Sequence, residues 1–147
     1  MLKKRWAESW TKSPRYRRLR FHDLLTPSSQ KFLTYISNKE ISRKTASRIF
    51  QLRVGHAPLN LYLHRFKIID NPRCPACGHP KETPEHFLLQ CPSYAHERWP
   101  ILNKLGGNLP KLSKLLTSAK LLLPLVNYIE ASGRFELETD TQAVSST

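Results

Sequence analysis

The segment CPACGHPKETPEHFLLQC, residues 74–91, contains all three cysteines of the 147-residue chain. Its first two cysteines form a C-x2-C pair, a histidine follows after eight further residues, and the third cysteine follows after four more. Three thiolates and one imidazole make up a Cys3His set, a standard closed shell for structural Zn²⁺, whose coordination is tetrahedral. We therefore predict a structural zinc knuckle with the ligands Cys74, Cys77, His86 and Cys91.

Thr83 and Pro84 predict the start of a short helix inside this segment, with threonine as the N-cap and proline in the first helical position. This start places His86 in the first turn. Cys91 follows five residues later, which is not same-face spacing in an α-helix, so the helix should end before Cys91. Pro92 is consistent with that end, because proline does not continue a helix.

His79 is an alternative fourth ligand. Only one residue separates it from Cys77, which would give a strained chelate, and we therefore prefer His86. Although Glu85 precedes His86, the segment lacks the H-x-E signature of zinc deaminases and the H-E-x-x-H signature of zinc proteases. With four protein ligands and neither motif, the metal is expected to be structural rather than catalytic.

The positive charge of the chain is concentrated in its first half. The sequence has 24 Lys and Arg against 11 Asp and Glu, a formal net charge of +13. Residues 1–73 contain 17 of the basic and 4 of the acidic residues, whereas residues 74–147 contain seven of each. Such an asymmetry indicates contact with a polyanion, of which nucleic acid is the commonest. The residues that we expect to contact the phosphates of RNA or DNA are Arg15, Arg17, Arg18, Arg20, Arg43, Lys44 and Arg48.

The densest basic stretch, residues 15–20, has a second interpretation. Tyr16 and Leu19 stand three residues apart and would share the core-facing side of a helix, while the arginines around them would be solvated. The sequence alone leaves both interpretations open. An acidic protein partner would also complement the same positive charge.

Apolar residues at helical spacing predict a mainly α chain, a small helical domain with the zinc knuckle embedded in it and little or no β structure. We expect helices over residues 3–12, 28–37, 42–54, 58–66, 93–105, 110–120 and 122–132. Gly55 should end the third of these, and Gly106 and Gly107 the fifth, which Pro100 should limit. The expected segments are a basic helical segment at 1–73, the knuckle at 74–92, C-terminal helices at 93–135 and a disordered tail at 136–147.

The expected core positions follow the same helical spacing. In the helix at 42–54 the apolar side consists of Ala46, Ile49 and Phe50, with Lys44 and Arg48 opposite. The two clearest stripes are Leu59, Tyr62, Leu63 and Phe66 in the fourth helix and Leu122, Leu125, Val126 and Ile129 in the last.

No run of 18 uncharged apolar residues occurs in the sequence, so no membrane-spanning helix is expected. The N-terminal residues also lack the apolar stretch of a secretory signal peptide. We therefore expect an intracellular protein, nuclear or cytoplasmic, whose cysteines stay reduced and available to a metal.

Several motifs along the chain occur together in one known kind of sequence. They are SPRYRRL at 13–19, FQLRVGHAPLN at 50–60, YLHR at 62–65, the C-x2-C-G block at 74–78 with ET at 82–83, HFLL at 86–89, CP at 91–92 and ASGRF at 131–135. Together they resemble the C-terminal tail of non-LTR (LINE-like, jockey/Tad-type) retrotransposon polyproteins, over roughly residues 5–135.

In that family, a polyprotein with an endonuclease, a reverse transcriptase and often a ribonuclease H ends in a basic helical segment and a zinc knuckle. The tail is thought to help hold the element's RNA or the target DNA during reverse transcription. The resemblance therefore implies a non-catalytic module that binds nucleic acid, with knuckle ligands at the four positions predicted above. Neither the aspartate pair of a polymerase palm nor a ribonuclease H carboxylate cluster appears in this sequence. We accordingly expect an orphaned tail that begins at its own Met1.

Three other interpretations of the chain stay open. The basic half could dock on an acidic protein partner, such as a polymerase domain that this chain lacks. A residual nuclease would show hydrolysis that a chelator of divalent metals removes. A truncated or decayed transposon copy would have no function.

Overall fold

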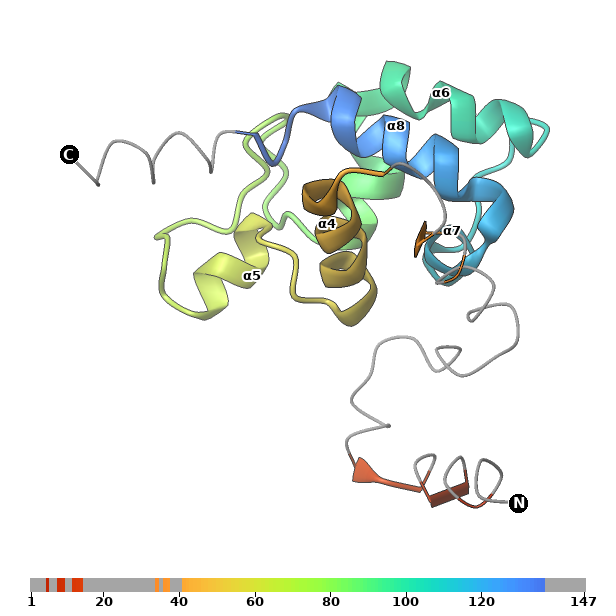
Figure 1. Ribbon diagram of the computed structural model, residues 1–147. Coiled ribbons are helices and arrows are strands. Elements are labelled where there is room, and N and C mark those ends of the chain that lie inside the picture. The colour runs from red at the N-terminus through yellow and green to blue at the C-terminus, as the bar shows by residue number, and fades with distance from the viewer. Residues whose placement is uncertain are drawn as a thin grey trace.

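The computed structural model describes residues 5, 8, 9, 12–14, 34, 36, 37 and 41–136. No β-strand occurs among these described residues, so the expected fold class, mainly α with little or no β, is confirmed. The helices α4 to α8 are shown in Figure 1. In chain order the elements are α4 (Arg43–Val54), α5 (Asn60–Arg65), the π-helix η2 (His86–Gln90), the 3₁₀ turn η3 (Pro92–Tyr94), α6 (Ala95–Lys104), α7 (Leu112–Thr117), the 3₁₀ turn η4 (Ala119–Leu121) and α8 (Leu122–Ser132).

Residues at both ends of helix α4 cap it. The Ser42 hydroxyl accepts a hydrogen bond from the Thr45 amide at 3.1 Å, and Gly55 ends the helix in the left-handed conformation with φ 76°. The predicted helix and its glycine end are thus confirmed. Its core side is shifted from the expected one, because Leu52 is buried while Phe50 is 42% exposed. Leu52 follows the buried Ile49 by three residues and therefore lies on nearly the same side of the helix. Phe50 directly follows Ile49 and is turned away from it by about 100° around the helix axis.

Helix α5 is shorter than expected and does not form the predicted core stripe. It starts two residues after Pro58, and none of its residues is buried. Leu59 is buried, but Phe66 is 57% exposed. Figure 1 shows α5 standing beside α4, away from α6 and α8, so this six-residue helix has only one side near the rest of the fold.

Pro100 does not limit the fifth predicted helix, because it lies inside α6. The proline is exposed, and the helix continues for one more turn despite the lost backbone donor. Gly107 closes the helix as predicted, with φ 88° and its amide 2.9 Å from the Leu102 carbonyl. The expected helix at 110–120 is divided into α7 and η4.

Helix α8 is the central helix of the fold. It packs against α4 and α6 on two sides, and α7 contacts it as well. Its predicted core stripe is confirmed, and Gly133 ends the helix with φ 60°. One hydrophobic cluster contains α8 together with residues from α4, from η2 and from the chain after α8, including Ile49, Phe87 and Phe135. Described residues before, within and after the cysteine segment therefore share one core.

Several expectations fall on residues that the structure does not describe. The helices at 3–12 and 28–37 lie mostly outside the described residues, as do Arg15, Arg17, Arg18 and Arg20 and the tail after Glu136. Within the described part of the chain, no helix has the length and apolar character that crossing a membrane would need.

Candidate metal centre

The side chains of Cys74, Cys77, His86 and Cys91 converge, and one ligand atom from each lies within 4.8 Å of all the others. The sulfur atoms of Cys74 and Cys91 are 3.8 Å apart, and the Cys77 sulfur is 3.3 Å from Nε2 of His86. Around a tetrahedral Zn²⁺, two thiolates lie about 3.8 Å apart, and a thiolate and an imidazole nitrogen lie about 3.5 Å apart. The four residues that the sequence predicted therefore form a group of the size and shape that zinc requires.

The C-x2-C pair is held in a tight turn. The Gly78 amide donates to the Cys74 carbonyl at 2.9 Å, and the Cys74 amide donates to the His79 carbonyl at 2.9 Å. Gly78 has φ 77°, a conformation that other residues adopt only with strain. Ser93 of η3 donates to the Ala76 carbonyl at 2.9 Å, which ties the turn to the element that follows the last cysteine.

A wide helical turn aligns His86 with Cys91. The Thr83 hydroxyl caps the start by accepting from the His86 amide at 3.0 Å, as predicted. The Cys91 amide donates to the His86 carbonyl at 2.7 Å, a hydrogen bond that spans five residues and characterises a π-helix. In an α-helix, five residues turn by about 500°, leaving the two side chains roughly 140° apart. The helix does end before Cys91, and its π geometry brings the two ligands to the same side.

Arg98 of α6 supports the end of this π-turn. The residue is only 5% exposed, and its guanidinium donates from Nε to the Leu88 carbonyl at 2.9 Å and from Nη2 to the Cys91 carbonyl at 2.8 Å. The Tyr128 hydroxyl of α8 donates to the Phe87 carbonyl. Side chains from two helices therefore satisfy carbonyl groups at the end of a short helix, where intrahelical partners run out.

Glu82 organises the loop between the C-x2-C turn and the π-turn. Its side chain is fully buried and accepts two hydrogen bonds from the Arg134 guanidinium, at 2.7 and 2.8 Å. It accepts a third from the backbone amide of Asn60 at 2.7 Å. The Asn60 side chain in turn donates to the carbonyl of Arg73, the residue before Cys74, at 2.6 Å. This network links α5 and the residue that follows Gly133 to the metal centre.

The electrostatic surroundings differ among the ligands. A backbone hydrogen bond from His79 lowers the pKa of the exposed Cys77, which favours its thiolate form. Burial raises the pKa of Cys74 to about 11, so a thiolate at this position needs a neighbouring cation. Burial also lowers the pKa of His86 and keeps its imidazole neutral, the form that coordinates metals.

The alternative ligand His79 lies outside the group of four. Its ring stacks on His86 with centroids 4.3 Å apart, and its Nδ1 is 3.0 Å from the Lys81 carbonyl oxygen. Nδ1 of His86 is buried and has no hydrogen-bond partner among the described residues, and the His79 ring covers one face of the imidazole.

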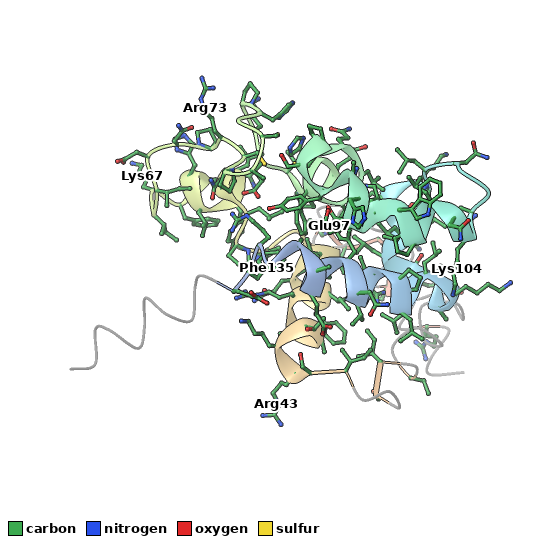
Figure 2. The ribbon with its side chains drawn as sticks, turned by 90° about the horizontal axis from the view of Figure 1, so that it is seen from above. Arg43, Lys67, Arg73, Glu97, Lys104 and Phe135 are labelled. Carbon is green, nitrogen blue, oxygen red and sulfur yellow. The ribbon has the colours of Figure 1, made fainter. Side chains whose placement is uncertain are left out.

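Of the residues expected to contact nucleic acid, the structure describes Arg43, Lys44 and Arg48, and their surroundings are not uniformly basic. Arg43 and Lys44 are exposed on α4, but Arg48 is half-buried, with its guanidinium carbon 5.1 Å from the centroid of the Phe135 ring. Lys44 and Arg48 also line a pocket of about 340 Å³ together with the carboxylates of Glu130 and Glu136. In Figure 2, Arg43 lies far from Lys67 and Arg73, the labelled basic residues that follow α5.

The supporting residues Glu82, Arg98 and Arg134 were not assigned a role from the sequence. Their partners lie 7 to 52 residues away along the chain and in other structural elements, so no spacing rule within one helix or hairpin connects them. The only signal was that Glu82 and Arg134 belong to two of the motifs shared with retrotransposon tails.

Comparison with known proteins identifies related sequences. A family described as zinc-binding in reverse transcriptase matches residues 10–99, which include all four predicted ligands. A stretch of 71 residues is 32% identical to a retrovirus-related Pol polyprotein from the type-1 retrotransposable element R1 4 of Nasonia vitripennis. That stretch covers 47% of this chain and 18% of the relative, so the chain spans a small part of the polyprotein that it matches. No solved structure matches the chain. The predicted relationship to non-LTR retrotransposon polyproteins is confirmed.

Proposed function

Because this chain belongs to the family of zinc-binding domains found in reverse transcriptases, we propose that it is a non-catalytic, zinc-dependent nucleic-acid-binding module derived from the tail of a retrotransposon polyprotein. The observation that carries this proposal is the convergence of three thiols and one imidazole in a chain whose net charge is +13. The metal supplies a cross-link, and the basic residues supply contacts to phosphate.

Under this proposal Zn²⁺ is held by Cys74, Cys77, His86 and Cys91. Four protein donors complete a tetrahedral shell and leave no open position for a substrate, which is typical of structural sites. The ion would join the C-x2-C turn to the π-turn, and its binding free energy would stabilise the fold. Arg98 and Glu82 act through the loops that carry the ligands.

The proposal assigns the module no catalytic step of its own. Among the described residues, the Cys3His group is the one set of His, Cys, Asp or Glu side chains with the geometry to hold a metal. Reverse transcription and ribonuclease H cleavage both need metal ions held by carboxylates. The basic residues expected to contact RNA or DNA contribute charge and not sequence readout.

Binding of the purified full chain to single-stranded RNA, single-stranded DNA and duplex DNA tests the proposal. Zinc content is measured first, and affinity is then followed by fluorescence anisotropy over a series of salt concentrations. We expect one zinc ion per chain and an affinity that falls linearly with salt on logarithmic axes. Binding that ignores salt, or no binding to any of the three probes, would overturn the proposal.

Matched variants separate the metal from the charge. Cys91→Ser should abolish both zinc binding and nucleic-acid binding, whereas His79→Ala should keep the zinc. The triple variant Arg15→Ala, Arg17→Ala, Arg18→Ala should keep the zinc and show a flatter salt dependence. Loss of zinc in the His79 variant but not in a His86→Ala variant would show that the fourth ligand is misassigned.

Docking to a protein partner is a second candidate function. Phe66 and Ile68 are 57% and 65% exposed at the end of α5, with Lys67 between them. These exposed apolar side chains are the feature that a partner protein would cover in a docked complex. If Phe66→Ser and Ile68→Ser together abolish capture of a reverse transcriptase domain and leave nucleic-acid binding unchanged, docking is the better description.

A further inference from the structure

Residues 74–147 have no net charge, but their acidic and basic residues are unevenly distributed along the sequence. Between Glu97 and Glu130 the sequence contains no acidic residue. Its basic residues in that interval are Arg98, Lys104, Lys111, Lys114 and Lys120. Arg98 is buried against the metal centre, but the four lysines are all exposed. A local excess of positive charge is therefore present in a half whose total is zero.

Three of these lysines surround a single pocket. Lys104 at the end of α6, Lys114 in α7 and Lys120 in η4 line a cavity of about 660 Å³. The Lys104 ammonium donates to the Lys120 carbonyl at 3.4 Å, which holds the first lysine at the pocket wall. Among the described residues no acidic side chain lines this cavity, whereas Glu130 and Glu136 line the pocket beside α4 together with Lys44 and Arg48.

The remaining wall of the pocket is largely apolar. Leu105 and Leu123 lie on it, and Leu123 is 41% exposed to solvent. Lysine ammonium groups bind phosphate as point charges, and apolar walls accommodate the sugar or base attached to it. The volume falls in the range of about 300–1,000 Å³ that small-molecule sites occupy, enough for one nucleotide unit.

We propose that this lysine pocket, defined by Lys104, Lys114 and Lys120, binds the phosphodiester backbone of a nucleic-acid strand. The inference rests on the proposed function and adds a contact surface outside the first 73 residues. Figure 2 shows Lys104 at the opposite end of the molecule from Lys67 and Arg73, so the pocket is separate from the basic residues beside α5. The combination of ammonium groups and apolar wall favours a nucleotide unit over an acidic peptide, whose carboxylates would leave the leucines uncovered.

Charge removal in the zinc-loaded full chain tests the pocket. The pocket variant carries Lys104→Gln, Lys114→Gln and Lys120→Gln, and a matched control carries Arg65→Gln, Lys67→Gln and Lys81→Gln. Each phosphate contact to a single strand contributes about 0.7 to the slope of log affinity against log salt. We expect the slope to fall by about 2 in the pocket variant and by clearly less in the control. Equal falls in both variants would overturn the inference, because they would indicate a general charge effect.

Lysine footprinting locates the contact directly. An amine-reactive label is applied to the wild-type chain with and without a single-stranded oligonucleotide, and the modified positions are read by mass spectrometry. Lys104, Lys114 and Lys120 should be protected, while Lys111, which is exposed but does not line the pocket, should react equally in both samples. Protection by polyglutamate and not by the oligonucleotide would assign the pocket to an acidic protein and overturn the proposal.

The two proposals fail in distinguishable ways. If the wild-type chain binds no nucleic acid, the proposed function falls and the pocket falls with it. If the wild type binds with the expected salt dependence while the pocket variant keeps the full slope and its lysines stay reactive, only the pocket is wrong.

Discussion

Arg134 and Glu82 form a bidentate ion pair across 52 residues of sequence, with nitrogen–oxygen distances of 2.7 and 2.8 Å. The glutamate side chain has no exposed surface, and the arginine side chain is 12% exposed. The pair connects the chain directly after α8 with the loop between the two halves of the metal centre. The C-terminal helices are therefore part of the support of the zinc ligands, although the family match ends at residue 99.

Replacing Arg134 with alanine should lower the free energy of unfolding by about 3–5 kcal/mol, because the Glu82 carboxylate would stay buried without its cation. Urea unfolding of the zinc-loaded chain measures this change. The exposed Arg65 provides a control, since Arg65→Ala should change the stability by less than about 0.5 kcal/mol. Similar midpoints for the two variants would show that the ion pair contributes little.

A chain that ends at residue 99 should not fold cooperatively, even with zinc. It would lose α8, whose Leu122, Leu125 and Tyr128 have no exposed surface in the intact fold. A chain that ends at Glu136 keeps this helix and Arg134 and serves as the control. Thermal melting followed by circular dichroism distinguishes them, and a sharp transition in the shorter chain would contradict the role assigned to α8.

Arg98 should influence zinc affinity without touching the metal. In Arg98→Leu the carbonyls of Leu88 and Cys91 lose their donor, and we expect zinc affinity to fall by about 10–100-fold, as for other groups that orient ligands. Lysine at this position should not restore it, because one ammonium cannot reproduce the two fixed donors of a guanidinium. Competition with a chromogenic chelator gives the affinity, and Asn103→Ala on the same helix is the control.

The three cysteines should react in a definite order in metal-free protein. Cys77 is exposed and has a lowered pKa, whereas Cys74 is buried with a pKa of about 11 and Cys91 is buried. Because the thiolate is the reactive form, iodoacetamide should modify Cys77 first. Mass spectrometry after a short exposure reads the order, and zinc should slow all three reactions. Faster modification of Cys74 would contradict the burial described for it.

The metal centre was largely predictable because its ligands are close in sequence and of unusual residue types. The C-x2-C spacing and the N-cap at Thr83 are local features, and the structure reproduces them. The π-turn was not predictable, since the same residues fit an α-helix that simply stops before Cys91. Arg98 and Tyr128 donate to carbonyls of this turn from α6 and α8, and they lie 10 and 41 residues further along the chain than their partners.

The helical core was predictable where a helix is long and packs on several neighbours. Helix α8 follows its apolar spacing because α4, α6 and α7 all contact it. Helix α5 has the same spacing, but Phe66 stays exposed because the helix has only six residues and lies at the edge of the fold. Pattern alone does not show which helices will be surrounded, so the core stripe of α8 was predicted correctly and that of α5 was not.

Acidification should release zinc and destabilise the fold together. Burial lowers the pKa of His86 below its ordinary value of 6.5, so the folded chain keeps this imidazole neutral at a pH where the unfolded chain has protonated it. The unfolded state then binds more protons, and stability falls as the pH is lowered through about 6.5. Zinc reinforces the dependence, because it binds only the neutral ring.

Unfolding of the zinc-loaded chain in urea at a series of pH values, with released zinc measured in parallel, checks this linkage. Both signals should change in the same pH window below 6.5. The variant His96→Ala removes an exposed histidine on α6 and should leave the window unchanged. If stability stays constant across the window while the zinc is lost, the imidazole of His86 does not couple the metal to the fold, and the Cys3His assignment would need a different fourth ligand.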